Sequence, residues 1–344
     1  MIRCCGRSPR KRKPMKTLSE GLLDTIRRTG NIVLATHINP DGDALGSLLG
    51  LADIQTGMGK KVFRYLEEPV SHLYQFLPDS HLLRTDLEDL AGFIREAGAD
   101  VLCIALDCGD RKRLGKNADE LLRIRPFLVI DHHKGNDGFG DLAWIDPQRS
   151  STGEMVFDLA VALGQSVSMK AADSLFAAIV TDTGAFRYES TSAHTFDVAR
   201  LLVAAGVKPD LVSRNLYDNY SVARLQLLQM VLATLEVHCG GRVAVISVTR
   251  DILDRTGCTL EDTENFINLP RSVTSVEVAV FLKEVGEDRV SVSMRAKDTC
   301  DVAEVAAQFG GGGHRNAAGF KTAATTLDEV RARLLPVLQR QLGC

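Results

Sequence analysis

The sequence predicts an α/β protein, in which a doubly wound, mainly parallel sheet is followed by a smaller α+β domain. Three observations lead to this fold class. Short apolar runs alternate with amphipathic stretches over residues 17–207, and these runs are nearly continuous in apolar residues. After residue 207 the apolar period changes to two. Continuous apolar strands are typical of a parallel sheet that helices cover on both faces, whereas a period of two indicates one buried face.

The expected strands of the first domain are apolar runs of strand length. They lie at 31–36, 61–65, 101–107 and 127–131. The expected helices between and after them have apolar residues at helical spacing. They lie at 44–55, 87–97, 118–124, 152–163, 171–180 and 194–205. Alternation of strands and helices in this way is typical of βαβ units.

The rest of the chain predicts a linker helix and a second, smaller domain. The segment 221–235 has a helical pattern without Gly or Pro. Alternating apolar residues over 276–282 and again over 290–294 predict a hairpin with one buried face, and a helix at about 327–342 closes the domain. The expected boundaries are 1–16 for a tail, 17–207 for the first domain, 208–236 for the linker and 237–344 for the second domain.

Length and composition are those of a globular protein with two domains. The chain has 344 residues, of which 45% are hydrophobic and 25% are charged. Its apolar runs fall far short of the ~20 residues that a membrane-spanning helix needs. The eight cysteines show no CxxC motif and no regular spacing, which favours a reducing cytosol over secretion. We therefore expect a cytoplasmic protein with no membrane partner.

Charge is distributed unevenly along the chain. The formal net charge is −3, but residues 1–16 contain seven of the 41 Lys and Arg residues and no acidic residue. The rest of the chain has 34 basic and 44 acidic residues, a net charge of −10. Because long duplexes are bound mainly through phosphate neutralisation, we expect no stable binding of long duplexes. The basic tail lacks the apolar stretch of a signal peptide and is interpreted as a disordered extension, with a nucleic-acid or partner contact as the alternative.

Acidic and imidazole side chains follow three of the expected strands and end one expected helix. They are His37, Asp41, Asp43, Asp107, Asp131, His132, His133 and Asp182. Each motif alone has an ordinary explanation, such as a turn or a helix N-cap. The carboxyl ends of parallel strands meet at one edge of the sheet, so the topology is expected to bring these groups together.

A cluster of this composition indicates divalent cations. Carboxylates gathered in a crevice are costly unless cations compensate them. Ligation by oxygen with a minority of imidazole favours Mn²⁺ or a similar hard ion over structural zinc. More than four ligands suggest two ions about 3.5–4 Å apart, an arrangement that is typical of phosphoester hydrolysis.

A run of four glycines precedes His314 and Arg315 in the second domain. The run consists of Gly310, Gly311, Gly312 and Gly313. Successive glycines expose backbone N–H groups and permit the close approach of an anion. No Gly-Lys-Ser/Thr follows, so the segment is not a P-loop, and a flexible loop is the ordinary alternative. Together with His314, Arg315 and Arg295 on the preceding expected strand, the glycines predict a phosphate-binding cradle.

These motifs together resemble the Asp-His-His (DHH) phosphoesterase superfamily. The residues 131–133 match the motif that names it, and Asn136 stands at the usual following position. The segments 37–43 and 181–184, with Asp107, match its other metal motifs, and 309–319 is similar to the glycine-rich motif of the DHH-associated C-terminal domain. The resemblance covers residues 17–344. Size and motif order are most similar to the NrnA-type nanoRNases (oligoribonucleases) and pAp phosphatases.

The resemblance implies two Mn²⁺ ions per active site. One ion would be bound by His37, Asp41 and Asp107. The other would be bound by Asp43, Asp107, His132 and Asp182, so that Asp107 bridges the two ions.

The resemblance also implies catalytic and substrate-binding residues. Asp131 would orient the histidine pair, His133 would contact the scissile phosphate, and Asp107 would act through both ions. The substrate would be held from the second domain by Arg295, Gly310, Gly311, Gly312, Gly313, His314 and Arg315. Ala296 stands where relatives usually carry Ser, a departure that removes one minor phosphate contact.

The implied activity is hydrolysis of short oligoribonucleotides (two to five nucleotides, such as pApA) to mononucleotides, and of 3′-phosphoadenosine 5′-phosphate (pAp) to AMP. The nucleophile would be a hydroxide that bridges the two ions. Short RNA and pAp are thus the expected partners, and family likeness suggests a homodimer. The alternatives are a family II-type inorganic pyrophosphatase, a soluble cyclic-dinucleotide phosphodiesterase and a catalytically silent nucleotide sensor. The glycine segment argues against the first of these, and the intact ligand set argues against the last.

Overall fold

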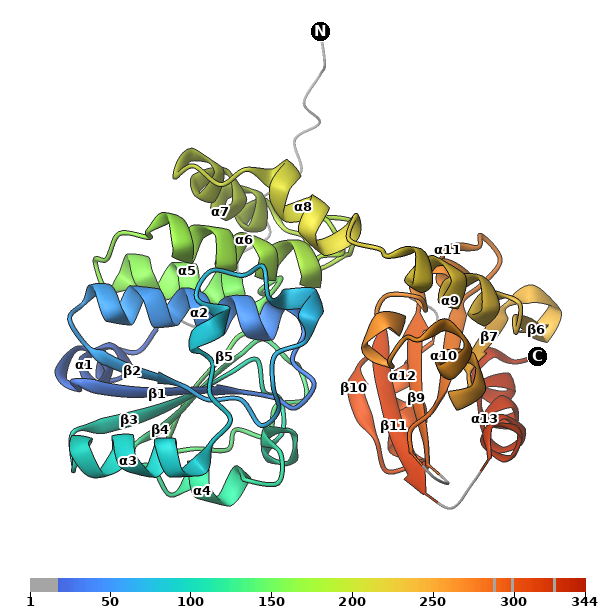
Figure 1. The fold of residues 1–344 in the computed structure, drawn as a ribbon, viewed down its shortest axis with the longest axis horizontal. Helices are drawn as coiled ribbons and strands as arrows, with labels where there is room; N and C mark the ends of the chain where they lie inside the picture. Colours follow the sequence, from blue (N-terminus) through green and yellow to red (C-terminus); the bar gives the residue numbers. More distant parts are fainter. Residues whose placement is uncertain (1–17, 287–288, 298–299, 324–325) are drawn as a thin grey trace, which may run out of the picture. The chain divides into compact units, whose positions relative to one another are not determined.

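The computed structural model describes residues 18–286, 289–297, 300–323 and 326–344. The chain divides into two compact units, of which the first ends at Leu216 and the second begins at Tyr217 (Figure 1). Each unit has a sheet of its own. The basic tail expected at 1–16 lies outside the described residues. Within the described ranges, no helix combines the length and the apolar character needed to cross a bilayer.

The first unit contains the parallel sheet that the sequence predicts. Over its described residues, five parallel strands pair in the order β2-β1-β3-β4-β5. They are β1 (Asn31–Thr36), β2 (Lys61–Arg64), β3 (Val101–Leu106), β4 (Phe127–Asp131) and β5 (Leu142–Ile145). β1, β3 and β4 are buried almost throughout, as expected of strands with helices on both sides. The predicted fold class and its first four strands are confirmed, and β5 is an addition.

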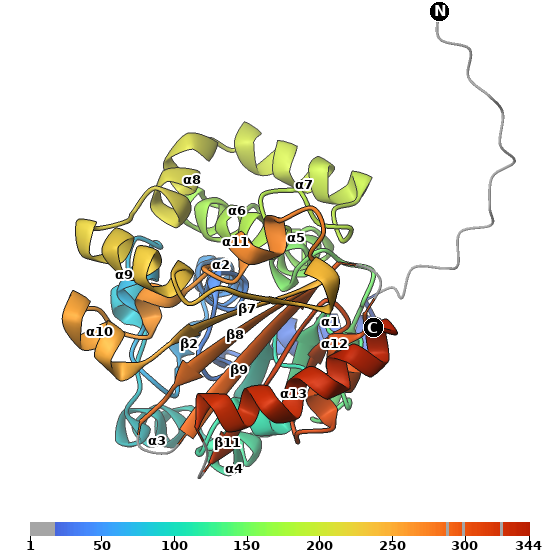
Figure 2. The same ribbon diagram turned by 90° about the vertical axis from the view of Figure 1, so that its right-hand side faces the viewer.

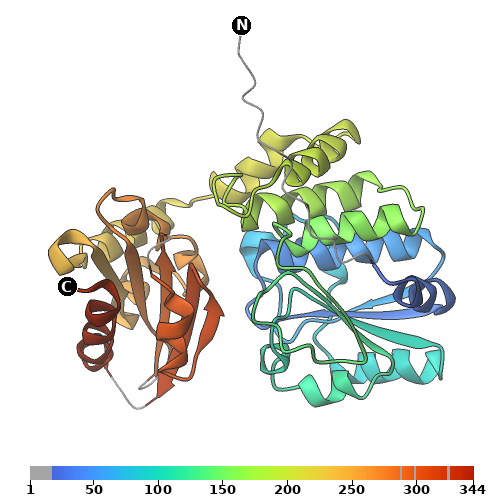
Figure 3. The same cartoon turned by 180° about the vertical axis from the view of Figure 1, so that it is seen from behind.

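Helices lie on both faces of this sheet (Figures 1 and 3). The helices of the first unit are α1 (Glu20–Arg28), α2 (Gly42–Gly57), α3 (Leu87–Ala97), α4 (Ala118–Leu122), α5 (Thr152–Ala162), α6 (Met169–Asp182), α7 (Ala193–Ala204) and α8 (Pro209–Tyr217), of which α7 packs on α5 and α6. Short 3₁₀ turns lie at His72–Tyr74, Ser80–Leu82 and Arg111–Leu114. Helices α3 and α4 share one buried cluster with β1, β3 and β4, and α2, α5 and α6 lie on the opposite face. The six predicted helices are present, with ends within two residues of the prediction.

Helix α2 is buried on almost all sides because it lies between the sheet and α6. Gly46 permits this close approach: a Cβ at this position would lie 2.3 Å from the carbonyl oxygen of Ser174 and 2.9 Å from Cβ of Ala178. Gly153 near the start of α5 is constrained in the same way, since its Cβ would lie 2.5 Å from Cβ of Ala178. The tight packing brings the amino ends of α2 and α5 together beside the strand ends.

The second unit is built on a mixed sheet (Figure 2). In the part of this unit that the structure describes, six strands pair in the order β10-β11-β9-β8-β7-β6, and β7 runs parallel to β8. The strands are β6 (Glu236–His238), β7 (Val243–Val248), β8 (Val278–Glu284), β9 (Arg289–Ala296), β10 (Gly312–His314) and β11 (Ala317–Ala323). The helices are α9 (Val222–Leu232), α10 (Arg250–Thr256), α11 (Asn268–Ser272), α12 (Val302–Ala307) and α13 (Leu327–Leu342). Short 3₁₀ turns lie at Cys239–Gly241 and Glu261–Thr263.

The hairpin of β8 and β9 corrects the expectation of a single buried face. β9 alternates between buried and less buried residues, as expected. In β8, however, Val280 and Phe281 are both buried, although they point to opposite faces. Val280 packs in the cluster that includes α12 and α13, whereas Phe281 packs in the cluster that includes α9 and α10. Alternate residues of β8 therefore belong to two different apolar faces, because helices cover this strand on both sides.

Cys239 and Cys344 form a disulfide that joins the turn after β6 to the end of the chain. Their Cα atoms lie 5.6 Å apart, although the two cysteines are 105 positions apart along the chain. Sequence spacing does not reveal this bond, because only folding brings the two cysteines together. Among the described residues, the other cysteines are free thiols.

Candidate metal centre and active site

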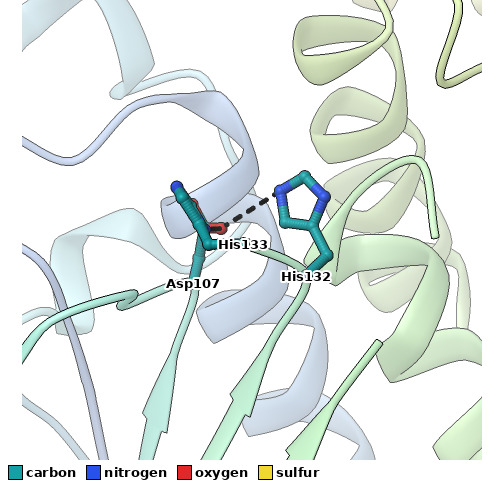
Figure 4. Close-up of side chains that lie close together, drawn as sticks. All are labelled: Asp107, His132 and His133. Carbon is teal, nitrogen blue, oxygen red and sulfur yellow. Dashed lines mark ion pairs between the residues drawn. The ribbon is translucent and has the colours of Figure 1, made fainter. Parts of the chain in front are cut away.

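The candidate ligands of the first unit meet at the carboxyl-terminal edge of its sheet. Asp107 directly follows β3, His132 and His133 directly follow β4, and these three side chains lie together (Figure 4). His37 follows β1, and Asp182 ends α6. The remaining candidates lie at the start of α2 and the end of β4, and they are Asp41, Asp43 and Asp131. The strand ends thus meet as parallel topology requires.

Within the described residues, three groups of these side chains have ligand atoms within 4.8 Å of one another. The groups are His37, Asp41 and Asp107; Asp43, His132 and Asp182; and Asp107, His132 and His133. The carboxylate of Asp107 lies 3.5 Å from Nε2 of His37 and 3.5 Å from Nε2 of His132. Asp107 therefore lies between the two sets of ligands that the family resemblance implies for two ions.

Backbone contacts orient two of the imidazoles. Nδ1 of His37 lies 2.8 Å from the carbonyl oxygen of Ile38, and Nδ1 of His132 lies 3.3 Å from that of Arg149. A carbonyl can only accept, so in each ring Nδ1 carries a hydrogen, and in the neutral ring Nε2 has the lone pair that can bind a metal. In both rings Nε2 faces the carboxylates, which is the arrangement a metal ligand requires. The Arg149 side chain is itself held by ion pairs to Glu154 (3.1 Å) and Asp158 (2.8 Å).

The amino end of α5 holds the buried carboxylate of Asp43. The backbone N–H of Thr152 donates to Oδ2 at 2.7 Å, and that of Gly153 donates to Oδ1 at 2.9 Å. The hydroxyl of Ser47 donates to Oδ1 at 3.0 Å. A helix amino terminus stabilises a negative charge, so α5 fixes both the position and the orientation of this carboxylate. Sequence reasoning missed these contacts, and the only local signal is the Ser151 N-cap that begins α5.

Asp107 has a backbone conformation that non-glycine residues seldom adopt. Its φ is +54°, in the left-handed region, where strained residues often mark functional sites. The Thr152 hydroxyl donates to its Oδ1 at 3.1 Å. Although burial alone would raise the pKa of Asp107, a hydrogen bond with His37 and the nearby His133 and His132 hold it well below its usual range. The carboxylate is therefore ionised and fixed where both ligand groups meet.

Asp131 orients His133 instead of joining a ligand group. Its Oδ1 accepts a hydrogen bond from Nδ1 of His133 at 2.6 Å, and its Oδ2 accepts one from the side-chain amide of Asn136 at 2.6 Å. The same amide donates to the carbonyl oxygen of Cys108, beside Asp107. Burial lowers the pKa of His133, but the bond to Asp131 outweighs this and raises it. With Nδ1 held in this way, Nε2 is the ring atom that can act on a substrate.

Burial and mutual repulsion perturb the pKa values of the cluster. Burial, together with the charge of Asp107, raises the pKa of Asp43 well above its usual range. Burial also raises the pKa of Asp182 to about 6. Burial alone would lower the pKa of His132, but Asp182 and the other carboxylates raise it to about 10. The cluster carries more negative charge than its imidazoles compensate, so its donor set fits divalent cations.

The candidate cradle residues belong to the second unit. Arg295 lies on β9, where it pairs with Ala317 on β11, and Ala317 in turn pairs with the backbone of His314 on β10. The remaining candidates lie in the segment between α12 and β11, and they are Gly310, Gly311, Gly312, Gly313 and the exposed Arg315.

Two of the four glycines have a structural reason. A Cβ at Gly311 would lie 2.2 Å from the carbonyl oxygen of Gly319, and one at Gly313 would lie 2.5 Å from that of Ala317. Both glycines therefore allow the segment to pack against β11. At Gly310 and Gly312 a Cβ would meet nothing within 4 Å. These two positions leave room beside the backbone, which is compatible with the expected cradle.

Comparison with known proteins shows the family to which the chain belongs. The chain matches the model of the DHH family, N-terminal domain, over residues 31–179 and that of the DHHA1 domain over 240–340. It is 33% identical to the bifunctional oligoribonuclease and PAP phosphatase NrnA of Thermus thermophilus, over 91% of this chain and 90% of that protein. It is 27% identical to the protein of the same name from Bacillus subtilis, over 87% of this chain and 91% of that protein. The crystal structure of an exopolyphosphatase-related protein from Bacteroides fragilis superposes with a TM-score of 0.85 at 28% identity, over 96% of this chain and 97% of that one.

Proposed function

Since this chain belongs to the DHH family of phosphoesterases, we propose that it hydrolyses short oligoribonucleotides to mononucleotides and pAp to AMP. The observation that carries this proposal is the cluster around Asp107, in which one carboxylate belongs to two groups of candidate metal ligands. Two relatives are named for both activities, and the similarity to this chain covers 90% and 91% of their length. The same type of site serves both reactions, because each breaks a P–O ester bond.

We assign the metal sites as the family resemblance implies. His37, Asp41 and Asp107 would hold one Mn²⁺, and the second would be held by Asp43, Asp107, His132 and Asp182. Two such ions supply Lewis-acid stabilisation of the negative charge that develops on the phosphoryl oxygens. The chain's own contribution is rigidity: α5 fixes Asp43, Thr152 fixes Asp107, and two backbone carbonyls fix the imidazoles.

His133 is assigned to the scissile phosphate. Its Nδ1–H is held by Asp131, so the ring is fixed and Nε2 is the atom that can donate a hydrogen bond to a phosphoryl oxygen. The raised pKa of His133 favours the protonated form that such a donor requires. The side-chain amide of Asn136 donates a hydrogen bond to Oδ2 of Asp131 and so fixes the carboxylate that orients His133. A fixed donor of this kind is worth most where charge develops in the transition state.

The second unit is assigned to the rest of the substrate. Arg295 and the segment from Gly310 to Arg315 would bind a phosphate that is not cleaved. A guanidinium suits this role because it binds phosphate with two parallel hydrogen bonds. Local basic groups together with divalent cations would allow a chain with net charge −3 to bind a short polyanion.

The test is a comparison of three substrates. Protein stripped with EDTA and reloaded with Mn²⁺ is incubated with pApA, pAp and inorganic pyrophosphate, and products are separated by chromatography. We expect turnover of pApA and pAp, little release from pyrophosphate, and no turnover before Mn²⁺ is restored. Rapid cleavage of pyrophosphate with inert nucleotides would identify a pyrophosphatase instead. Stoichiometric metal binding without turnover of any of the three would contradict the proposed activity altogether.

A further inference from the structure

One face of the second unit's sheet carries polar groups beyond the candidate cradle. On β9, the residues that alternate with the buried cluster are Ser291, Ser293 and Arg295. On β11, the corresponding residues on the same face are Ala317, Gly319 and Lys321. Helices α9 and α10 cover β7 and β8 on this side and form the buried cluster around Phe281. The polar face of β9 and β11 lies beyond that cluster, and its serines and Lys321 are partly or fully exposed.

The register of the strands arranges this face in three rows. The first row, at the cradle, joins Ala279, Arg295 and Ala317. The second joins Phe281, Ser293 and Gly319, which pairs further with Gly312. The third joins Lys283, Ser291 and Lys321. Neighbours within a row lie about 5 Å apart, so the third row places the backbones of two lysines on either side of Ser291.

Few neighbouring groups compensate the positive charge of the Lys283 side chain. Its ammonium lies 4.6 Å from the centroid of the Phe281 ring and donates to the Thr263 hydroxyl at 3.0 Å. Within the described residues, no carboxylate lies within ion-pair distance of it. Burial lowers its pKa to about 8, an effect that Glu264 opposes and Arg295 increases. A partly buried ammonium with one neutral acceptor is stabilised by an anion that supplies the missing acceptors.

The distance between the first and third rows fits an oligonucleotide backbone. Four residues along β9 separate Arg295 from Ser291, which at about 3.4 Å per residue is about 14 Å. Successive phosphorus atoms of RNA are joined by six covalent bonds, or about 7 Å when extended, judging from the 3.8 Å that three bonds span between Cα atoms. Measured along the backbone of β9, the two rows are therefore about two nucleotide repeats apart. Between them, a Cβ at Gly312 would meet nothing within 4 Å, which leaves space there for a ribose or a base, whereas a Cβ at Gly319 would lie 2.4 Å from the carbonyl oxygen of Val292.

We propose that Lys283, Ser291 and Lys321 form a second phosphate subsite, which binds a backbone phosphate of RNA longer than a dinucleotide. This inference rests on the proposed function, since it assumes that Arg295 and the glycine segment bind the first uncleaved phosphate. With one phosphate being cleaved and one in the cradle, the subsite two repeats further would be reached by substrates of four or five nucleotides. The substrates pAp and pApA are too short to reach it.

The test compares substrate lengths in two variants. Lys321→Ala removes an exposed charge, and Lys283→Met removes the ammonium while retaining a side chain that can pack over Phe281. For 5′-phosphorylated pentaadenylate we expect kcat/KM to fall about tenfold in each variant, which is the loss of one charge-assisted hydrogen bond. For pApA and pAp we expect kcat/KM to stay within twofold of the wild type. Arg340→Ala is the matched control, because it removes a charge from α13, which covers the opposite face of the sheet.

The outcomes separate this inference from the proposed function. A wild-type protein that cleaves none of the nucleotides contradicts the proposed function itself. If the wild type cleaves all three and both lysine variants treat the pentamer as the wild type does, the second subsite is wrong. It is equally wrong if Lys321→Ala, the exposed variant, slows pApA as much as the pentamer. Length-selective loss in Lys321→Ala supports the subsite even if Lys283→Met fails to fold.

Discussion

Replacement of Asp107 by Asn tests the core of the proposed site with the smallest change of shape. The substitution removes one negative charge and keeps the size of the side chain. In the structure, the carboxylate of Asp107 lies 3.5 Å from Nε2 of His37 and of His132, and it belongs to two of the candidate ligand groups. One substitution therefore perturbs both positions at which an ion is proposed.

The expected magnitude follows from the charge that is lost. Two unit charges 4 Å apart contribute about 4 kcal/mol at an effective dielectric constant of about 20. An increase of about 4 kcal/mol in the activation barrier corresponds to a loss of about 10³-fold in rate. Because the proposed cations are divalent and two positions are affected, 10³-fold is a lower bound for Asp107→Asn. We expect this loss in kcat/KM for pApA at saturating Mn²⁺.

Metal binding provides an independent measurement of the same change. A ligand present at 100 times its Kd adds about 2.7 kcal/mol to the free energy of unfolding. We expect Mn²⁺ to raise the Tm of the wild type and this rise to be largely lost in Asp107→Asn. The amount of bound metal, measured by mass spectrometry, should fall in the same variant. Asp100→Asn is the matched control, since Asp100 lies at the other end of β3, where it accepts hydrogen bonds from the backbone of Gly30. A folded Asp107→Asn protein with activity within tenfold of the wild type and unchanged metal content would refute the assignment of Asp107.

Three further changes test other parts of the structure. Thr152→Val removes the hydrogen bond from the hydroxyl to Asp107 but keeps the backbone hydrogen bond to Asp43. We expect kcat/KM at limiting Mn²⁺ to fall about tenfold. If the rate depends on Mn²⁺ concentration as it does in the wild type, this expectation is wrong. Cys344→Ser opens a loop of 105 residues and should lower the free energy of unfolding by about 2–5 kcal/mol in urea titrations; reduced wild type should then match the variant, and a difference that persists under reduction would show another cause. Burial lowers the pKa of Lys283 to about 8 in the folded protein, whereas its value in the unfolded chain is about 10.4. Between these two pH values the unfolded chain binds more protons than the folded protein. The free energy of unfolding should therefore rise by about 2–3 kcal/mol from pH 8 to 10.5. Lys283→Met should lack this rise, and an identical pH profile would mean that the ammonium is not desolvated.

The parts of the fold that could be predicted are those whose signal lies in one short stretch of sequence. β1, β3 and β4 are buried on both faces, so each appears as an uninterrupted apolar run. β5 has only four residues at the edge of the sheet, of which Trp144 alone is buried, so its sequence has neither pattern. In β8 the alternation of residue types was visible, but the helices that bury its second face lie elsewhere in the chain.

The candidate site shows the same division between local and long-range information. The strand ends of a parallel sheet meet by topology, so the positions of Asp107 and His132 could be expected to converge from sequence. The hydrogen bonds from Thr152 to Asp43 join residues 109 positions apart and depend on glycines that allow α2, α5 and α6 to pack closely. No local pattern shows that contact, and the disulfide between Cys239 and Cys344 is hidden for the same reason.

The net charge of the chain says little about what it binds, because the carboxylates proposed to bind metal and the basic groups proposed to bind phosphate lie in different units. Asp43 and Asp107 are buried in the first unit, whereas Lys321 is exposed in the second. Chelation and salt should therefore act on different steps: EDTA should stop turnover of every substrate, while salt screens the exposed basic row and weakens binding of the longer substrates most. Each phosphate contact on a single strand adds about −0.7 to the slope of log affinity against log salt. The pentamer should therefore show a steeper slope than pApA, and the slope for the pentamer should decrease in Lys321→Ala. Equal slopes for pApA and the pentamer would mean that one phosphate site serves both, and the second subsite would have to be abandoned.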